Sequence, residues 1–158
     1  MVAAGDNGSG TMGKRFGLLF PGQGAQHVGM GKELYDTRLS ARLVFDRAGE
    51  ILGRDIGKLC FEGPEDELMA TANSQPAIFV TSIAALNVLI QALKGGYSGG
   101  EKGEMFSPQD ILQVGGIVMG LSLGEPVALM ACGALSFEDG LHFVRKRGEF
   151  MEEASQKK

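Results

Sequence analysis

The 158-residue sequence predicts an α/β fold in which helices flank a parallel sheet. Two short apolar runs, Arg15–Phe20 and Gly116–Met119, have the length and the flanking turn residues of buried strands. Longer stretches between and after them show helical periodicity. The second run leads through Gly120–Gly124, a G-x-S-x-G pattern, into an apolar, helix-like run. A strand, a tight turn and a helix in this order are typical of an α/β core.

The composition sets limits on the class of protein. The length suits one domain, and 44% hydrophobic residues suffice for a core. A net charge of −4 gives no indication of a nucleic-acid surface. Two cysteines and two histidines argue against a disulfide framework and a zinc site. Residues 1–14 have neither the apolar segment of a secretory signal nor the pattern of a transit peptide, so we expect a flexible leader there.

The first half of the chain predicts helices at three places. Met30–Asp36 is short and amphipathic. We expect Ser40 to cap a second helix, because its hydroxyl can accept from a first-turn N–H, and Gly53 to end it. Pro64 is followed by acidic residues and predicts the start of a third helix.

A longer helix is predicted for Pro76–Lys94, which is apolar almost all round. It is long enough to raise the question of a membrane span. Polar residues interrupt it, so we expect a helix buried in a soluble core. The glycine-rich segment Gly95–Phe106 that follows predicts a loop. The polar interruptions are Thr81, Ser82, Asn87 and Gln91.

The last predicted helix, Phe137–Ala154, carries one charge on its apolar side. Ser136 with Asp139 forms a plausible capping box at its start. At about 100° per residue, Arg147 projects from inside the apolar arc, where an unpaired charge is costly. Arg147 therefore either pairs with a carboxylate of the chain, such as Glu125, or binds an anion. The apolar arc consists of Leu141, Val144, Gly148 and Met151, widened by Phe143, Phe150 and Ala154.

The G-x-S-x-G pattern predicts a nucleophile elbow at Ser122. Gly120 and Gly124 lack side chains, so the turn can be sharp and the strand and helix can pack closely. Ser122 then stands at the head of a helix, where free N–H groups and the helix dipole favour developing negative charge. The alternative is a chance match in a chain with 25 glycines. The loop Gly22–Gln26 either exposes backbone N–H groups to a ligand or is a plain turn.

Four short motifs stand in order along the chain: Phe20–Gln26 (FPGQGAQ), Asn73–Ala77 (NSQPA), Gly120–Glu125 (GLSLGE) and Val144–Gly148 (VRKRG). Together they resemble the malonyl-CoA:acyl-carrier-protein transacylase family, the acyltransferases of fatty-acid synthesis. Each motif alone is weak, but four in order at sensible spacings are specific. The similarity runs from about Arg15 to the C-terminus.

The resemblance implies roles for five residues. Ser122 matches the nucleophile that takes the malonyl group from coenzyme A and passes it to the phosphopantetheine thiol of the carrier. The backbone N–H groups of Gln23 and Leu123 match the oxyanion hole, and Gln75 matches a glutamine that lines the site. Arg147, 25 residues after Ser122, matches the arginine that holds the malonyl carboxylate. Leu123 is also associated with selection of malonyl over methylmalonyl.

The resemblance further implies a hydrolase-like acyltransferase core, of which residues 15–158 form the N-terminal part. The family chain is longer, and its catalytic histidine, a second active-site glutamine and a ferredoxin-like subdomain match nothing before Lys158. Of the two histidines present, His142 falls on the polar arc of the last helix, and His27 is better explained as a polar residue at a helix entry. The base is therefore not identified.

The implied partners are acyl carrier protein and a coenzyme A thioester, with no metal or redox cofactor, no nucleic acid and no membrane span. Two positions depart from the family pattern: Leu121 replaces a histidine and Pro126 replaces a tyrosine. Leu121 is associated with plastid-type relatives, and the compartment stays open between plastid, mitochondrion and others. The alternatives are a truncated, non-catalytic fragment, a piece of a polyketide synthase acyltransferase domain, and a serine esterase, against which Arg147 argues.

Overall fold

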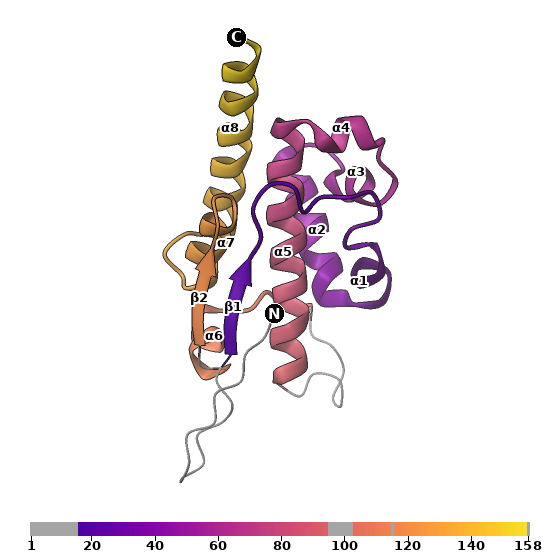
Figure 1. Cartoon of the computed structure of the whole chain (residues 1–158). Coiled ribbons are helices and arrows are strands. Elements are labelled where there is room, and N and C mark those ends of the chain that lie inside the picture. The colour runs from indigo at the N-terminus through magenta and orange to yellow at the C-terminus, as the bar shows by residue number, and fades with distance from the viewer. Residues whose placement is uncertain (1–15, 95–102, 115, 158) are drawn as a thin grey trace.

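The computed structural model describes residues 16–94, 103–114 and 116–157 (Figure 1). The predicted leader and residues 95–102 of the predicted glycine-rich loop lie outside these ranges. In the described ranges, six helices lie between the two strands, and two more helices follow the second strand. The elements are β1 (Phe16–Phe20), α1 (Lys32–Thr37), α2 (Leu39–Leu52), α3 (Ile56–Glu62), α4 (Glu65–Met69), α5 (Thr71–Leu93), α6 (Pro108–Val114), β2 (Gly116–Gly120), α7 (Gly124–Ala131) and α8 (Phe137–Gln156).

The two strands pair in parallel, with Phe20 opposite Gly120 at their C-terminal ends. This confirms the predicted α/β class with a small parallel sheet. Because side chains alternate along a strand, Leu18 is buried against the helices, whereas Leu19 is 61% exposed and Met119 51% exposed. The prediction that the first strand is buried therefore holds for the face that carries Leu18. It is wrong for the opposite face, which carries Leu19 and is not covered by the described helices. Both strands end beside the turn that carries Ser122.

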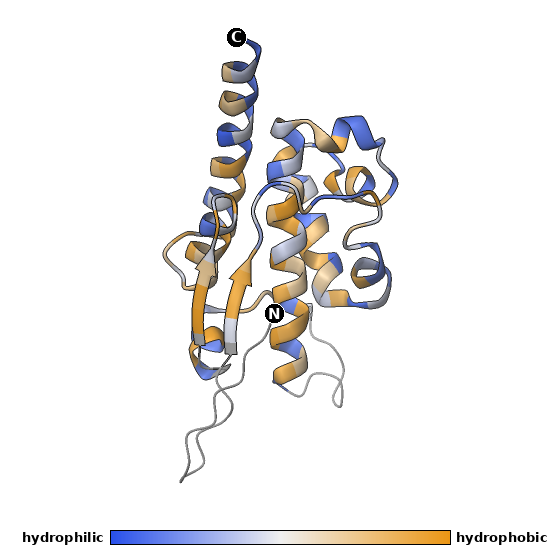
Figure 2. Ribbon diagram, viewed as in Figure 1, coloured by the Kyte–Doolittle hydropathy of each residue, from blue (hydrophilic) through white to orange (hydrophobic). Residues whose placement is uncertain are grey.

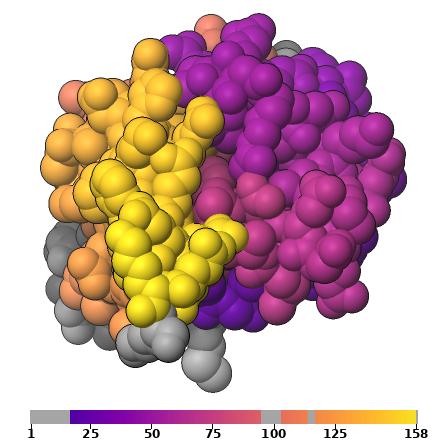
Figure 3. All heavy atoms as spheres, turned by 90° about the horizontal axis from the view of Figure 1, so that it is seen from above, coloured from indigo at the N-terminus to yellow at the C-terminus, as the bar shows by residue number. Residues whose placement is uncertain are grey.

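Helix α5 is the centre of the core, with α2 on one side and α8 on the other (Figures 1 and 3). Its apolar residues run along much of its length (Figure 2), and Phe79, Ile83 and Ile90 are fully buried. By length and composition α5 could cross a membrane. In the structure, 56% of its most apolar stretch is already buried by the neighbouring elements. A helix apolar all round matches a position between packed helices.

The predicted helix ends are right at some positions and wrong at others. Gly53 ends α2 in the left-handed conformation, at φ 66°, as predicted. Ser136 Oγ accepts from the Asp139 N–H at 3.0 Å, which confirms the cap of α8. Ser40 is not a cap: it lies buried within α2, whose cap position is Arg38.

Helix α5 begins at Thr71, five residues before the predicted start at Pro76. The reason is a contact from the far end of the chain. The Ala72 N–H, which has no partner within the helix, donates to Glu152 Oε2 of α8 at 3.0 Å. Local sequence cannot show this cap, because 80 residues separate donor and acceptor.

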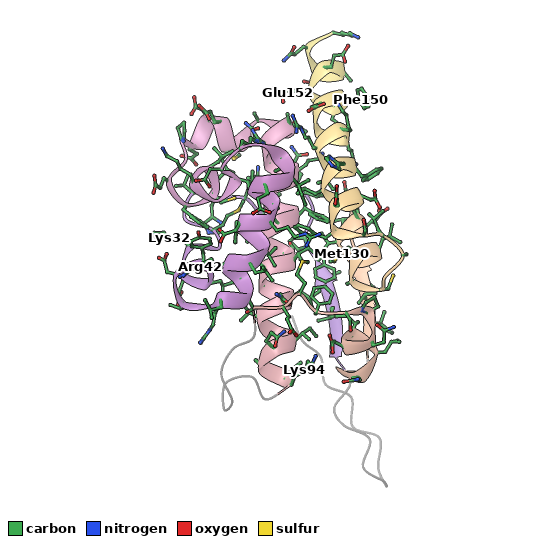
Figure 4. All side chains as sticks on the ribbon, turned by 180° about the vertical axis from the view of Figure 1, so that it is seen from behind. Lys32, Arg42, Lys94, Met130, Phe150 and Glu152 are labelled. Atoms are coloured by element: carbon green, nitrogen blue, oxygen red, sulfur yellow. The ribbon has the colours of Figure 1, made fainter. Side chains whose placement is uncertain are left out.

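Helix α8 packs on α5 through a narrow stripe. Leu141, Val144 and Gly148 are buried, as predicted. Phe143 and Phe150 do not widen the stripe: they are 52% and 65% exposed. In Figure 4, Phe150 projects from α8 away from the other helices, whereas Glu152 lies on the side toward them. A helical wheel gives the direction of each side chain, but the width of the covered arc depends on the neighbouring helix.

A buried amide joins the first half of the chain to the segment before α6. Asn87 on α5 donates through Nδ2 to the carbonyl oxygens of Ser40, at 2.9 Å, and Glu104, at 3.1 Å. Its Oδ1 accepts from the Phe106 N–H at 2.8 Å. All three partners are main-chain groups, so the side chain is satisfied although it is fully buried. The apolar helix α5 thus carries a polar residue that fixes the path of the chain leading to β2.

Asp110 anchors the start of α6 to the end of α5. Its Oδ2 accepts from the Ser107 N–H at 2.7 Å, and its Oδ1 accepts from Lys94 Nζ at 2.6 Å. These bonds stabilise the carboxylate and hold the pKa of Asp110 below its usual value, with the Lys94 hydrogen bond as the largest cause. The side chain therefore stays ionised while it caps the helix.

Candidate active site

Ser122 lies in a sharp turn between β2 and α7. Its φ of 54° is the one positive value among the described non-glycine residues, a conformation that costs about 1–3 kcal/mol. A Cβ on Gly120 would lie 2.0 Å from the Gly124 carbonyl, and a Cβ on Gly124 would lie 2.3 Å from Phe20 O. Both positions therefore require glycine. The turn holds Ser122 at an exposed position in front of the helix.

Three of the predicted site residues meet in the structure. Arg147 on α8 donates from Nη1 to Gln75 Oε1 at 2.8 Å and from Nη2 to Ser122 Oγ at 2.9 Å. Gln75, near the start of α5, is fully buried, and Arg147 is half-buried. The expected alternative, a pair with Glu125, does not form, and Arg147 is in no ion pair within ranges 16–94, 103–114 and 116–157. Its guanidinium therefore faces neutral acceptors.

Met151 is a further residue of this cluster. The Gln75 Nε2 group donates to Met151 Sδ at 3.0 Å, so the two ends of the amide contact two residues of α8. From the sequence, Met151 belongs to the apolar arc of the last helix and has no predicted part in the site. The available signal was its spacing of four from Arg147, which puts both side chains on one face of the helix.

The loop after β1 lies against the turn that holds Ser122. A Cβ on Gly22 would lie 2.9 Å from Leu121 O and 3.8 Å from Ser122 Cβ. The backbone N–H groups of Gln23, in this loop, and Leu123, after the serine, donate to no other described residue. The Gln23 side chain instead donates to Thr71 Oγ1 at 3.3 Å, at the start of α5. Two backbone donors that have no acceptor in the described ranges thus lie in the segments next to Ser122.

No described base contacts the serine. His27 Nδ1 lies 3.4 Å from its near neighbour Ala25 O, and His142 is exposed on α8. The one hydrogen bond of Ser122 Oγ within the described chain comes from Arg147, which is a donor only. In the part of the chain that the structure describes, no three His, Cys, Asp or Glu side chains lie together where they could hold a metal ion.

Comparison with known proteins finds relatives in sequence and in structure. A family model described as acyl transferase domain matches residues 18–158. The chain is 45% identical over 140 residues to the malonyl CoA-acyl carrier protein transacylase of Bacillus subtilis (strain 168), covering 89% of this chain and 38% of the relative. The crystal structure of the same enzyme from Clostridium perfringens superimposes with a TM-score of 0.68 at 43% identity, covering 87% of this chain and 38% of that one.

A second solved structure shows a relative with its partner. It is a type II PKS acyl-carrier protein in complex with its malonyl-transacylase, at 31% identity and a TM-score of 0.66, covering 87% of this chain and 39% of that chain. The chain thus spans less than two-fifths of the length of these relatives. The match to the family model begins within β1, at Leu18, and covers β2 and all of the helices described above. This chain belongs to the acyl transferase domain family.

Proposed function

We propose that this chain carries the acyl-accepting serine of a malonyl transfer in fatty-acid biosynthesis. The malonyl group passes from malonyl-CoA to Ser122, and from the resulting ester to the phosphopantetheine thiol of an acyl carrier protein. The family match, and relatives named malonyl CoA-acyl carrier protein transacylase, support this reaction class. The carrier as partner is supported by the relative solved in complex with its acyl-carrier protein.

The observation that carries the proposal is the position of Arg147. Its guanidinium lies 2.9 Å from Ser122 Oγ, yet its two acceptors are a hydroxyl and an amide carbonyl. A guanidinium has five N–H donors in a planar fork that fits a carboxylate. A cation that lies beside the nucleophile and has no carboxylate partner in the described chain suits an acyl group that itself carries a carboxylate. Malonyl carries such a carboxylate, whereas acetyl does not.

The turn at Ser122 serves as a nucleophile elbow in this proposal. Ser122 Oγ forms a bond to the thioester carbonyl carbon, the C–S bond breaks, and the coenzyme A thiolate takes up a proton as it leaves. The N–H groups of Gln23 and Leu123 stabilise the oxyanion of the tetrahedral intermediate. The carrier thiol then attacks the malonyl-serine ester, and the serine recovers its proton. The proton on Ser122 is removed by a base that we assign to no residue of the described chain.

The transfer goes through a serine ester, so the proposal includes no metal or redox cofactor. Coenzyme A enters as part of the substrate. The carrier of the solved relative serves a type II polyketide synthase, and the same chemistry applies to either kind of carrier. We favour the fatty-acid carrier because the resemblance is to the enzymes of that pathway.

Binding of two thioesters tests the carboxylate contact. In a Ser122→Ala chain, which cannot be acylated at this position, we expect malonyl-CoA to bind more tightly than acetyl-CoA. A charge-assisted pair is worth about 1.5–3 kcal/mol, roughly ten- to more than a hundredfold in affinity. Arg147→Ala should remove the preference, and Arg147→Lys should restore it in part, because lysine keeps the charge but not the fork. Equal binding of both thioesters before any change at Arg147 would overturn the proposal.

The non-catalytic alternative is favoured by one observation, the lack of a base next to Ser122 in the described chain. It predicts that the 158-residue chain binds malonyl-CoA selectively but gains no malonyl group. Incubation with malonyl-CoA followed by intact-mass measurement separates the two functions. A malonyl adduct that is lost in Ser122→Ala supports acyl transfer, whereas selective binding without an adduct supports the alternative. An adduct that persists in Ser122→Ala places the acylated residue elsewhere.

A further inference from the structure

We propose that Met151 is a positioning residue of this site: its thioether fixes the orientation of the Gln75 amide, and the amide in turn holds Arg147 beside Ser122. The proposal rests on the proposed function only for what Arg147 binds. Within the described chain, Met151 forms no hydrogen bond with Ser122. It acts through Gln75, whose Nε2 lies 3.0 Å from Met151 Sδ.

The chemistry of the three groups allows one orientation of the amide. The Arg147 guanidinium offers only donors, and a thioether sulfur offers only an acceptor. With its Oε1 toward Arg147, at 2.8 Å, and its Nε2 toward Met151, the Gln75 amide satisfies both neighbours. A flip of 180° about the last side-chain bond would set two donors against each other and two acceptors against each other. Met151 therefore disfavours the flipped orientation at one end of the amide, and Arg147 disfavours it at the other end.

The burial of Gln75 makes this orientation matter. The residue is fully buried, so an amide N–H that loses Met151 has no water to replace it. Met151 itself is 41% exposed, which is more than a residue kept for core packing requires. Arg147 and Met151 lie one helical turn apart on α8 and bracket the amide from the same face. The hydrogen bond from the Ala72 N–H to Glu152, the neighbour of Met151, fixes α8 against the start of α5 at this level.

Two substitutions separate positioning from packing. Met151→Leu keeps an apolar side chain of similar volume and removes the acceptor. Met151→Gln is more polar but returns an acceptor, its carbonyl oxygen, at similar reach. If Met151 only packs, Met151→Leu should preserve the exchange rate of the Gln75 amide and the thioester preference better than Met151→Gln does. If it positions the amide, the order is reversed. Phe150→Leu is the matched control, because Phe150 is the neighbouring residue of α8 and is 65% exposed.

The first readout needs no ligand. Hydrogen exchange of the Gln75 side-chain amide with solvent, measured by NMR in the 158-residue chain, should accelerate about fivefold in Met151→Leu, the factor that one neutral hydrogen bond is worth. It should return toward the original rate in Met151→Gln and stay unchanged in Phe150→Leu. An unchanged rate in Met151→Leu, or a faster rate in Met151→Gln than in Met151→Leu, would overturn the proposal.

The second readout connects the amide to specificity. In the Ser122→Ala background, Met151→Leu should reduce the preference for malonyl-CoA over acetyl-CoA about fivefold, and Met151→Gln should recover most of it. A preference that survives Met151→Leu unchanged contradicts the positioning role and leaves the proposed function standing. If the background shows no preference at all, the proposed function fails, and the exchange rate of the Gln75 amide still decides the role of Met151.

Discussion

Substituting Gly148 by alanine should loosen the contact that builds the site. Gly148 lies where α8 crosses the start of α5, and an added Cβ would lie 2.7 Å from Thr71 O and 3.0 Å from Ala72 Cα. Both atoms belong to the backbone, so neither can rotate away. To reach an ordinary contact of 3.4 Å, the two helices must separate locally by about 0.7 Å. The preceding residue, Arg147, moves with them.

The expected loss follows from three terms. Alanine in place of glycine inside a helix gains up to about 1 kcal/mol. Overpacking against a fixed backbone costs about 1–3 kcal/mol. The separation also lengthens the 3.0 Å hydrogen bond between the Ala72 N–H and Glu152, a charge-assisted bond worth about 1.5–3 kcal/mol when intact. We therefore expect Gly148→Ala to destabilise the chain by about 1–3 kcal/mol, which lowers the Tm by roughly 3–10 °C.

The control is a helical glycine with room beside it. A Cβ on Gly49, in α2, would meet only Arg54 O at 3.4 Å. Gly49→Ala should leave stability unchanged or raise it by about 0.5–1 kcal/mol. Thermal and urea unfolding of both variants give the comparison. If Gly148→Ala is as stable as the original chain while Gly49→Ala behaves as expected, the close approach of α8 to α5 is not a constraint on the fold.

Three other perturbations have defined outcomes. Asn87→Leu should lower the free energy of unfolding in urea by about 1–3 kcal/mol, because it leaves the buried Phe106 N–H without its acceptor and removes one donor each from the Ser40 and Glu104 carbonyls; Gln91→Leu, which removes only the outer contact to Glu104, should change it by less than about 0.5 kcal/mol, and equal losses would contradict the assignment. The pKa of Asp110 is depressed in the folded state, so the stability that its carboxylate gives the fold is complete above the ordinary value of 3.8 and is lost as the pH falls through the folded pKa. Asp110→Asn should therefore flatten the acid limb of a curve of unfolding free energy against pH. Superimposable acid limbs of the two chains would refute this. Cys132 is exposed, whereas Cys60 is buried and burial raises its pKa to about 12. A thiol reagent should therefore label Cys132 in the native chain and Cys60 only after denaturation. Equal labelling rates of the two thiols in the native chain would contradict the fold.

The parts of the site that were predictable are those encoded by local spacing. A strand, two glycines and a helix predict the turn at Ser122, and the wheel of the last helix shows that Arg147 lies on an apolar arc. Neither pattern could show which acceptor Arg147 meets, because Gln75 and Glu125 were both available in the chain. The structure resolves this through the packing of α5 against α8.

The parts that were not predictable depend on distant segments. The start of α5 is set by Glu152, 80 residues away, so its first turn could not be recognised from the residues around it. The role of Met151 depends on the buried amide of Gln75, and the wheel shows only that Met151 is apolar.

Helix α3 is not among the predicted helices, although its signal is local. Asp55 Oδ1 accepts from the Lys58 N–H at 2.8 Å, an ordinary side-chain cap.

The meeting of Ser122 and Arg147 follows from the lengths of two helices. Helix α7 has 8 residues and carries the chain about 12 Å away from the serine. Helix α8 begins at Phe137 and runs back toward the serine (Figure 1). Arg147, ten positions after Phe137, lies about 15 Å along the axis of α8. Each residue also turns the side chain by about 100°, so one insertion in the first turns of α8 would aim the guanidinium away from Ser122 while every motif stayed intact. The separation of 25 residues is therefore a structural quantity, since it sets both the height and the direction at which the cation reaches the hydroxyl.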